Sequence, residues 1–331
     1  MHRYWKAALA IAAAASLIAA AACGGDDDNG TEGTATSAPT TAAGASPTAA
    51  AGTTYPATIT DMLGRSVTIS AEPASVAAIS PTAVEFVYAV GETSKTRTKS
   101  VTYPAEAMSA KDIGSAYQPS LELIAGEAPD LIVADSVLQP QLAGDLEALN
   151  VPVLYVGASS FADVPKSFRI IGEALNTPQG EEQATALEEQ AAEIEAKIPA
   201  TKSKVLILNG TPDDFFAALP ESYVGDLAGL AGADNVAAGQ PSNAPFPGYT
   251  KLSLETIVAA APDVVLAITA APGQTISEGL AANPVWADVP AVTNQRVHEI
   301  DAQIFLQAPG PRAGTGLMAL AKLLYPEVFG E

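Results

Sequence analysis

Along the chain, short apolar runs alternate with longer segments in which apolar and polar residues follow a helical spacing. Apolar runs bounded by turn residues are typical of buried parallel strands, and apolar positions three and four apart are typical of helices. Alternation of the two predicts α/β units. Strands are predicted at 76–80, 130–134, 151–156, 205–208, 263–268 and 297–300, and helices at 83–90, 139–149 and 164–175.

One longer helical pattern lies between the two sets of strands. In residues 178–199 apolar side chains recur three or four residues apart, while the other faces carry Glu and Gln. This spacing predicts an amphipathic helix of about five turns. Pro178 and Pro199 bracket it, as expected of residues that begin and end a helix. We therefore predict two α/β lobes, 55–177 and 200–331, joined by a stiff helix that leaves little hinge motion.

Two segments of the chain have nearly the same sequence. Residues 120–134, SLELIAGEAPDLIVA, and 253–267, SLETIVAAAPDVVLA, are identical at eight of fifteen positions. Each copy predicts a short helix, a Pro-Asp turn and an apolar strand. A serine can cap each helix, and a glutamate in the first turn can favour the helix dipole. These residues are Ser120 and Glu122 in the first copy and Ser253 and Glu255 in the second.

The N-terminal residues differ in composition from the rest. Arg3 and Lys6 precede an apolar run that ends at Cys23, the only cysteine. The run is too short for a membrane helix, which needs about 20 residues, so residues 1–22 are predicted to be a cleaved export signal. Residues 23–54 are rich in Gly, Thr, Ala, Ser and Pro and cannot bury enough apolar surface to fold. We predict a flexible tether there.

Charge and motifs limit the partners and the chemistry. The net charge is -21, and loss of the leader, with two cations and no acid, would make it -23. Such acidity argues against nucleic acid or an anionic membrane surface as partner. The sequence has no GxSxG elbow and no phosphate-cradling glycine loop, and His298 is the only histidine after the leader. An enzyme and a bare metal-ion site are both disfavoured, and no cofactor is expected.

Several segments resemble one protein family, in the same order along the chain. They include TITDMLGRSVTI, ISPTAVEFVYAVG, PSLELIAGEAPDLIVAD, KLSLETIVAAAPDVV and PGPRAGTGLMALAKLLYPEVF. Over residues 57–329 the chain resembles the class III substrate-binding proteins of ABC importers, which capture iron-siderophores, haem or cobalamin. The AAAC sequence ending at Cys23 resembles a bacterial lipobox, whose cysteine is lipidated. The resemblance implies an α/β fold of two Rossmann-like lobes joined by one long rigid α-helix.

The resemblance also implies a function. An exported monomer, lipid-anchored to the outer face of the cytoplasmic membrane, would capture a metal chelate between its lobes and deliver it to an ABC permease and its ATPase. Ferric siderophore, corrinoid and haem are the chelates considered, in that order. Glu122 and Glu255 match the glutamates that meet permease arginines, although each can also act only on its helix dipole. A sensory or adhesive lipoprotein with the same fold is the alternative.

Ligand-contacting residues are expected in loops at the carboxyl edges of the strands. A large chelate favours aromatic walls. Tyr103 resembles a tyrosine-proline corner of cobalamin binders, and a guanidinium such as that of Arg312 can bind a carboxylate in forked geometry or simply open the last helix. The predicted residues are Ser80, Pro81, Tyr103, Tyr117, Phe215, Phe216, Tyr249, Gln303, Phe305 and Arg312.

Overall fold

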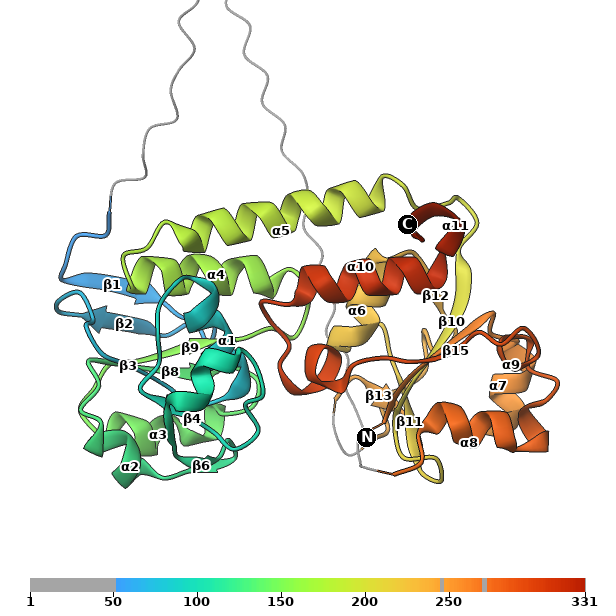
Figure 1. Ribbon diagram of the computed structural model, residues 1–331, viewed down its shortest axis with the longest axis horizontal. Coiled ribbons are helices and arrows are strands. Elements are labelled where there is room, and N and C mark those ends of the chain that lie inside the picture. The colour runs from blue at the N-terminus through green and yellow to red at the C-terminus, as the bar shows by residue number, and fades with distance from the viewer. Residues whose placement is uncertain (1–51, 245–246, 270–272, 331) are drawn as a thin grey trace, which may run out of the picture. The chain divides into compact units, whose positions relative to one another are not determined.

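The computed structural model describes residues 52–244, 247–269 and 273–330, all within one compact unit, Ala50–Glu331. The predicted leader, Cys23 and all but the last residues of the predicted tether lie outside the described residues. Figure 1 shows two α/β lobes with a long helix, α5 (Gln179–Glu195), running along one side of both. Within the described ranges, no helix combines the length and apolarity needed to cross a membrane.

Lobe 1 is built on a three-stranded parallel sheet with β8 in the centre. Every residue of its strands is buried, as expected when helices cover both faces of a parallel sheet. Its strands are β3 (Val76–Ala78), β8 (Leu131–Asp135) and β9 (Val153–Val156), with an antiparallel hairpin of β1 (Ala57–Thr60) and β2 (Ser66–Ile69) before them. Its helices are α1 (Pro81–Ala89), α2 (Leu121–Gly126), α3 (Ala143–Glu147) and α4 (Asp163–Ala174). Short elements complete it: β4 (Thr96–Arg97), η1 (Ala105–Ser109), β5 (Lys111–Asp112), β6 (Gly114–Ser115), β7 (Gln118–Pro119) and η2 (Pro140–Leu142).

Lobe 2 is built on a six-stranded mixed sheet around β10 (Ser203–Gly210). The strand-helix pattern predicts parallel pairing alone, but β11 runs antiparallel to β10. The reason is the tight turn between them, closed by a hydrogen bond from Thr211 N to Asp214 O (2.9 Å), because parallel strands need a long crossover.

The other strands are β11 (Phe215–Ala218), β12 (Ala233–Asn235), β13 (Tyr249–Thr250), β14 (Val264–Thr269) and β15 (Val297–Glu299). The helices are α6 (Tyr223–Leu230), α7 (Leu254–Ala260), α8 (Ile276–Ala282), η3 (Pro284–Trp286), α9 (Pro290–Thr293), the π-helix η4 (Gln303–Gln307), α10 (Ala313–Leu324) and α11 (Pro326–Phe329).

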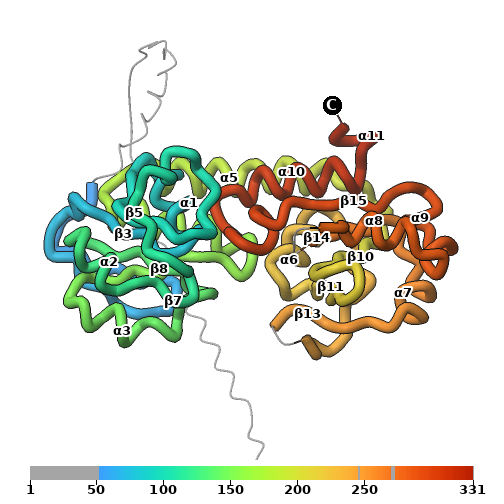
Figure 2. The backbone as a smooth tube through the Cα atoms, turned by 60° about the horizontal axis from the view of Figure 1, so that its bottom comes forward, coloured from blue at the N-terminus to red at the C-terminus, as the bar shows by residue number. Residues whose placement is uncertain are grey.

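The apolar core forms three clusters. Two of them each belong to one lobe and lie on a single face of its sheet. The third contains Leu131 of β8, Leu187 of α5 and Leu266 of β14, so it passes from one lobe through α5 to the other. In Figures 1 and 2, α5 and α10 lie side by side along this shared core.

The connecting helix is held tightly against lobe 1. The structure gives α5 as Gln179–Glu195, inside the predicted 178–199. A Cβ on Gly180 would lie 2.5 Å from the carbonyl oxygen of Phe168 in α4, and one on Gly172 would lie 2.7 Å from Gly180 Cα. Only glycine allows the backbones of α4 and α5 to approach this closely.

Both copies of the repeated segment form the predicted helix, turn and strand, as α2–β8 and α7–β14. The predicted serine caps are confirmed: Ser120 Oγ accepts a hydrogen bond from Leu123 N (3.3 Å) and Ser253 Oγ one from Thr256 N (3.1 Å). The alanine before each Pro-Asp turn has left-handed backbone geometry in both copies. These are Ala128, with φ of 46°, and Ala261, with φ of 49°.

Candidate ligand-binding site

The carboxyl edge of the lobe 1 sheet carries a buried polar network. Gln139 is fully buried, and its Nε2 donates to the carbonyl oxygens of Ile79 (2.8 Å) and Ala116 (2.7 Å). Its Oε1 accepts from the backbone N–H of Asp135 (2.9 Å). Because one side chain joins the ends of β3 and β8 to the loop before Tyr117, this edge is held in a defined shape.

Two further side chains on this edge accept hydrogen bonds from backbone N–H groups. Ser80 and Pro81 follow β3 and are buried, and Ser80 Oγ caps α1 by accepting from Ala83 N (2.9 Å). The carboxylate of Asp135, at the end of β8, accepts from the N–H groups of Val137 (2.8 Å) and Leu138 (2.9 Å), while burial raises its pKa. Ser80 and Pro81 therefore begin α1, which carries Glu85, and their direct contact with a ligand stays a prediction.

A buried ion pair joins the lobes. Arg312, just before α10, donates from Nε (2.8 Å) and Nη2 (2.6 Å) to the two carboxylate oxygens of Glu85 in α1. The Glu85 side chain is 2% exposed and that of Arg312 17%. Burial raises the pKa of Glu85, and the hydrogen bonds from Arg312 oppose that shift. Such a forked pair fixes the relative orientation of its two partners.

Three predicted ligand-contacting residues, Arg312 of this pair among them, lie close together at the junction of the lobes. The ring of Tyr103, half-exposed, stacks on the Arg312 guanidinium with 4.9 Å from Cζ to the ring centroid. The neighbouring Thr102 donates from Oγ1 to Oε1 of Gln303 (3.1 Å). Tyr103 comes from lobe 1 and Gln303 and Arg312 from lobe 2, so residues about 200 positions apart in the sequence converge.

The other predicted aromatic residues of lobe 2 have different environments. Phe215 packs edge-to-face on Trp286 with ring centroids 6.0 Å apart, whereas Phe216 lies under the ammonium group of Lys251, 5.4 Å from its ring centroid. Tyr249 is 8% exposed and Phe305 3% exposed, and both belong to the shared core. Both rings are therefore packed in the core in this structure, and direct contact between either ring and a ligand stays a prediction.

The two tyrosines upstream of the repeated segments also differ. Tyr117 lies at the turn between β6 and β7 and is 67% exposed. Tyr249 lies within β13, paired with β11, where burial raises its pKa to about 12. Of the two, only Tyr117 presents its ring to the surface in this structure.

The two glutamates of the repeat are both exposed. Glu122 lies in the first turn of α2 and Glu255 in the first turn of α7. Within the described ranges neither carboxylate forms an ion pair. Both are therefore available to a partner, and their docking role stays a prediction.

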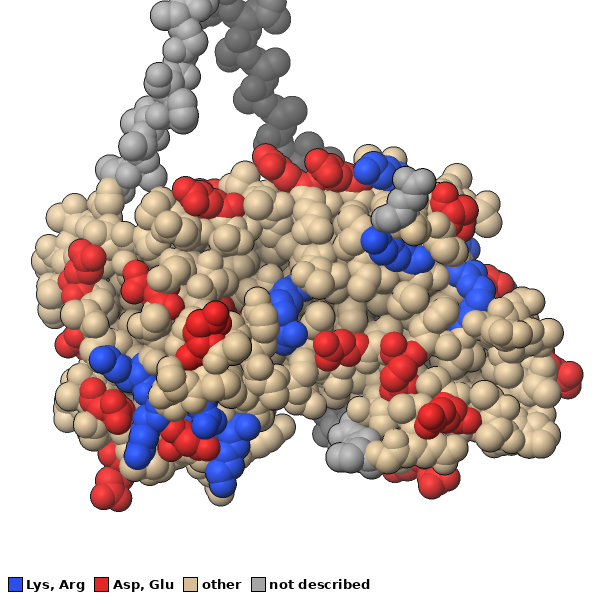
Figure 3. Space-filling view, in the orientation of Figure 1, with Lys and Arg blue, Asp and Glu red and all other residues tan. Residues whose placement is uncertain are grey.

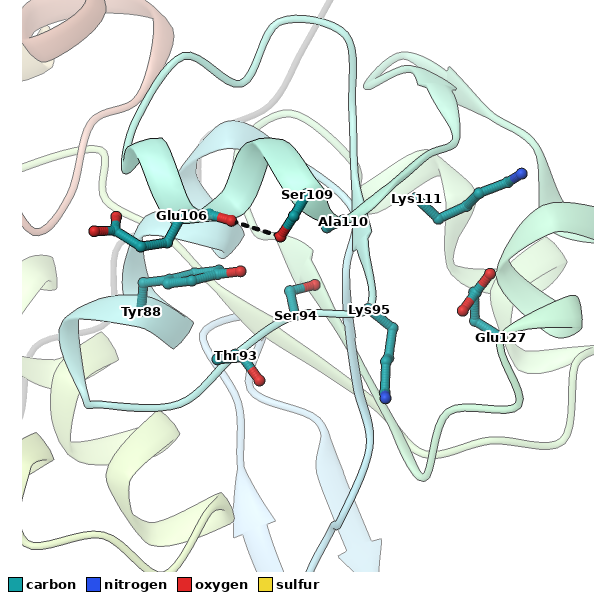
Figure 4. Close-up of a pocket in the computed structure, with 9 residues that line it drawn as sticks. All are labelled: Tyr88, Thr93, Ser94, Lys95, Glu106, Ser109, Ala110, Lys111 and Glu127. Atoms are coloured by element: carbon teal, nitrogen blue, oxygen red, sulfur yellow. Dashed lines mark hydrogen bonds between the residues drawn. The ribbon is translucent and has the colours of Figure 1, made fainter.

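A separate surface cavity of about 580 Å³ lies on lobe 1. Figure 4 shows that its charged side chains, among them Lys95 and Lys111, point in different directions and do not converge on one point. The hydroxyl of Ser109 donates to the carbonyl oxygen of Glu106 (2.9 Å). Tyr88 is the only aromatic side chain of its lining, which poorly fits a large chelate. A second cavity, of about 350 Å³, lies where Thr53 joins α4.

Sequence reasoning missed Glu85 and Asp226, which also link the lobes. Asp226 of α6 accepts a hydrogen bond at Oδ2 from the backbone N–H of Phe161 (2.7 Å). One signal pointed to Glu85: it is the only charged residue in the otherwise apolar stretch PTAVEFVYA, and a buried charge needs a partner. In the part of the chain that the structure describes, His, Cys, Asp and Glu form no group of three able to hold a metal ion.

The match to a known family is extensive. The periplasmic binding protein family matches residues 76–304, which include both sheets and most of the site described above. The chain belongs to this family. The resemblance to class III substrate-binding proteins is thereby confirmed, as is the fold of two Rossmann-like lobes joined by a long helix. The family comprises substrate-binding proteins.

Individual relatives agree with the family assignment. The chain is 26% identical over 288 residues to the ABC transporter substrate-binding lipoprotein YvrC of Bacillus subtilis, covering 84% of this chain and 88% of the relative. It is 26% identical over 201 residues to the Fe(3+)-citrate-binding protein YfmC of the same organism, covering 60% and 62%. Among solved structures, the apo heme-binding protein RhuT of Roseiflexus has a TM-score of 0.64 at 25% identity, covering 77% and 98%.

Proposed function

We propose that this periplasmic binding protein is the extracytoplasmic component of an ABC importer that captures a metal chelate between its lobes. The observation that carries the proposal is the convergence of Tyr103, Gln303 and Arg312 from the two lobes at one place. The names of the relatives support the transport role and the chelate, since they include an ABC transporter lipoprotein and binders of ferric citrate and heme. The protein acts by binding and release, with no chemical step.

The proposal extends to location and delivery. Export by residues 1–22 and lipidation at Cys23 would hold the body at the outer face of the cytoplasmic membrane through the tether. The name of YvrC, a substrate-binding lipoprotein, supports this location. A monomer would then dock on the permease through Glu122 and Glu255, whose exposed carboxylates suit a reversible contact with cations, because charge complementarity sets register and encounter rate.

Binding is tested by thermal shift against iron-siderophore, corrinoid and haem, with free zinc and manganese as controls. A cargo that binds only the folded state raises the melting temperature by mass action. We expect at least one intact chelate to do so. A shift with a free metal ion and with no chelate would contradict the proposal.

Delivery is tested by the double variant Glu122→Ala/Glu255→Ala. We expect unchanged cargo affinity and lost uptake in cells. The matched control is Glu189→Ala/Glu193→Ala, which removes two exposed carboxylates from α5, where neither forms an ion pair within the described ranges. Normal uptake by the first variant, or equal loss by both, would refute docking through the repeated segments.

A further inference from the structure

Arginine is the side chain best suited to bind a carboxylate. Every arginine in residues 52–330 already has a hydrogen-bonding partner within the protein. Four of the five are in ion pairs with carboxylates of the protein, and the fifth donates to backbone carbonyls. The pairs are Arg65 with Asp61 and Glu147, Arg97 with Asp112, Arg169 with Glu181 and Glu188, and Arg312 with Glu85, while Arg296 donates to the carbonyl oxygens of Leu323 and Leu324.

Arg312 is the arginine at the lobe junction, beside Tyr103 of the proposed site, and its side chain is 17% exposed. Both oxygens of Glu85 occupy its Nε and Nη2, and the ring of Tyr103 covers one face of its guanidinium. A cargo carboxylate could form this contact at Nε and Nη2 only by displacing Glu85, and at the other edge of the guanidinium it would meet a charge that Glu85 already neutralises. That displacement would leave a carboxylate with 2% exposure unpaired, which is strongly unfavourable.

The lysines of the neighbouring loops add little positive charge. The ammonium group of Lys251 lies 2.5 Å from Oδ1 of Asp214. Asp301 is exposed, forms no ion pair within the described ranges, and accepts a hydrogen bond at Oδ1 from the backbone N–H of Gln303 (2.7 Å). Asp301 is close enough to Glu85 to affect it electrostatically. Two carboxylates, those of Glu85 and Asp301, therefore lie near the single guanidinium of Arg312. Elsewhere on lobe 1, Figure 3 shows blue and red side chains interspersed.

We infer that the cargo is a metal chelate without net negative charge, such as a neutral or cationic tris-hydroxamate iron complex, and that Glu85 neutralises Arg312 to exclude anionic chelates. This inference rests on the proposed function. A neutral chelate can stack on Tyr103 and accept hydrogen bonds without breaking the ion pair. An anionic chelate finds the guanidinium already neutralised and meets the unpaired carboxylate of Asp301, and unfavourable placement of like charges is an effective means of excluding a ligand.

The test uses one iron chelate scaffold in three charge states. A linear tris-hydroxamate complex with a free terminal amine is cationic, its N-acetyl derivative is neutral, and its N-succinyl derivative is anionic. Binding to the mature chain is measured by calorimetry. We expect the first two to bind alike and the third about tenfold more weakly, a difference of about 1.4 kcal/mol. Tighter binding of the succinyl form, or binding of ferric citrate or haem in preference to the neutral complex, would overturn the inference.

The outcome also separates this inference from the proposed function. Binding of a corrinoid alone, whose amide side chains carry no charge, supports the inference. If no chelate of any charge binds, the proposed function itself fails. The variant Glu85→Gln keeps the side-chain size but frees the fork of Arg312, so it should reduce the discrimination against the succinyl form.

The matched control is Glu147→Gln, which removes an exposed carboxylate from Arg65 in lobe 1. This variant should leave the discrimination as in the parent protein. Melting curves establish that both variants are folded. If Glu85→Gln is folded and binds the neutral complex yet discriminates as the parent does, Glu85 has no part in charge selection.

Discussion

The two copies of the repeated segment fold alike, but the tyrosines upstream of them do not. Each copy has a serine-capped helix, a left-handed alanine, a Pro-Asp turn and a buried strand. Tyr117 is 67% exposed at a hairpin turn, whereas Tyr249 is 8% exposed inside β13. Local sequence determines the helix, the turn and the strand, while the neighbouring strand determines whether a side chain faces solvent.

Replacing each of these tyrosines with alanine should produce the largest difference in stability between the two copies. Tyr249→Ala removes a buried ring and should lower the free energy of unfolding by about 4 kcal/mol. Tyr117→Ala removes an exposed ring and should change it by less than about 0.5 kcal/mol. Urea unfolding followed by circular dichroism measures both. Similar losses would mean that the two tyrosines have equivalent environments after all.

The matched isoleucines should instead behave alike. Ile124 in α2 is 0% exposed and Ile257 in α7 is 1% exposed, each in the core cluster of its own lobe. Ile124→Ala and Ile257→Ala should each lower the free energy of unfolding by about 3 kcal/mol, because each leaves a cavity. Urea unfolding again gives the values. A difference above about 1.5 kcal/mol would show that the two lobes pack the repeat differently.

Burial of Tyr249 should also make stability depend on pH. Its pKa is raised from 10.0 to about 12. The unfolded chain releases the phenolic proton near pH 10, and the folded chain holds it until about pH 12. The contribution is therefore complete below pH 10 and is lost as the pH rises to 12, by roughly 3 kcal/mol. Tyr249→Phe should flatten this part of the pH dependence of the unfolding free energy, and an unchanged slope would contradict burial of the ring.

The smallest expected effect is a gain in stability. Ala128 and Ala261 hold the left-handed conformation that disfavours a Cβ. Relief of this strain in Ala128→Gly and in Ala261→Gly should raise the free energy of unfolding of each variant by about 0.5–1 kcal/mol. The additional conformational entropy that glycine gives the unfolded chain offsets part of this gain. Thermal melts of the two variants and of their combination test this. A loss of stability in one copy alone would show that its turn is not strained.

Much of the fold was predictable because buried parallel strands leave long apolar runs in the sequence. The connecting helix was also predictable, from the spacing of its apolar residues. The antiparallel strand β11 was not, since its direction follows from the four-residue turn before it. That lesson also applies to Phe215 and Phe216, which were expected in a loop and lie in that strand.

The site was predictable only in part. Tyr103, Gln303 and Arg312 were selected from their loops and lie together. The pairing of Arg312 with Glu85 was not foreseen, because these two residues are 227 positions apart and no local pattern links them. Packing around Phe305 likewise depends on contacts with distant elements, so its 3% exposure could not be inferred from its sequence neighbours.

The core that passes from lobe 1 through α5 into lobe 2 has a consequence for heating. Two lobes with separate cores would melt as two calorimetric peaks, each with its own enthalpy. Here the apolar side chains of both lobes contact one another through α5, so the molecule should absorb heat as a single cooperative unit. A cargo held by either lobe would then delay the melting of the whole body, including the lobe that it does not touch.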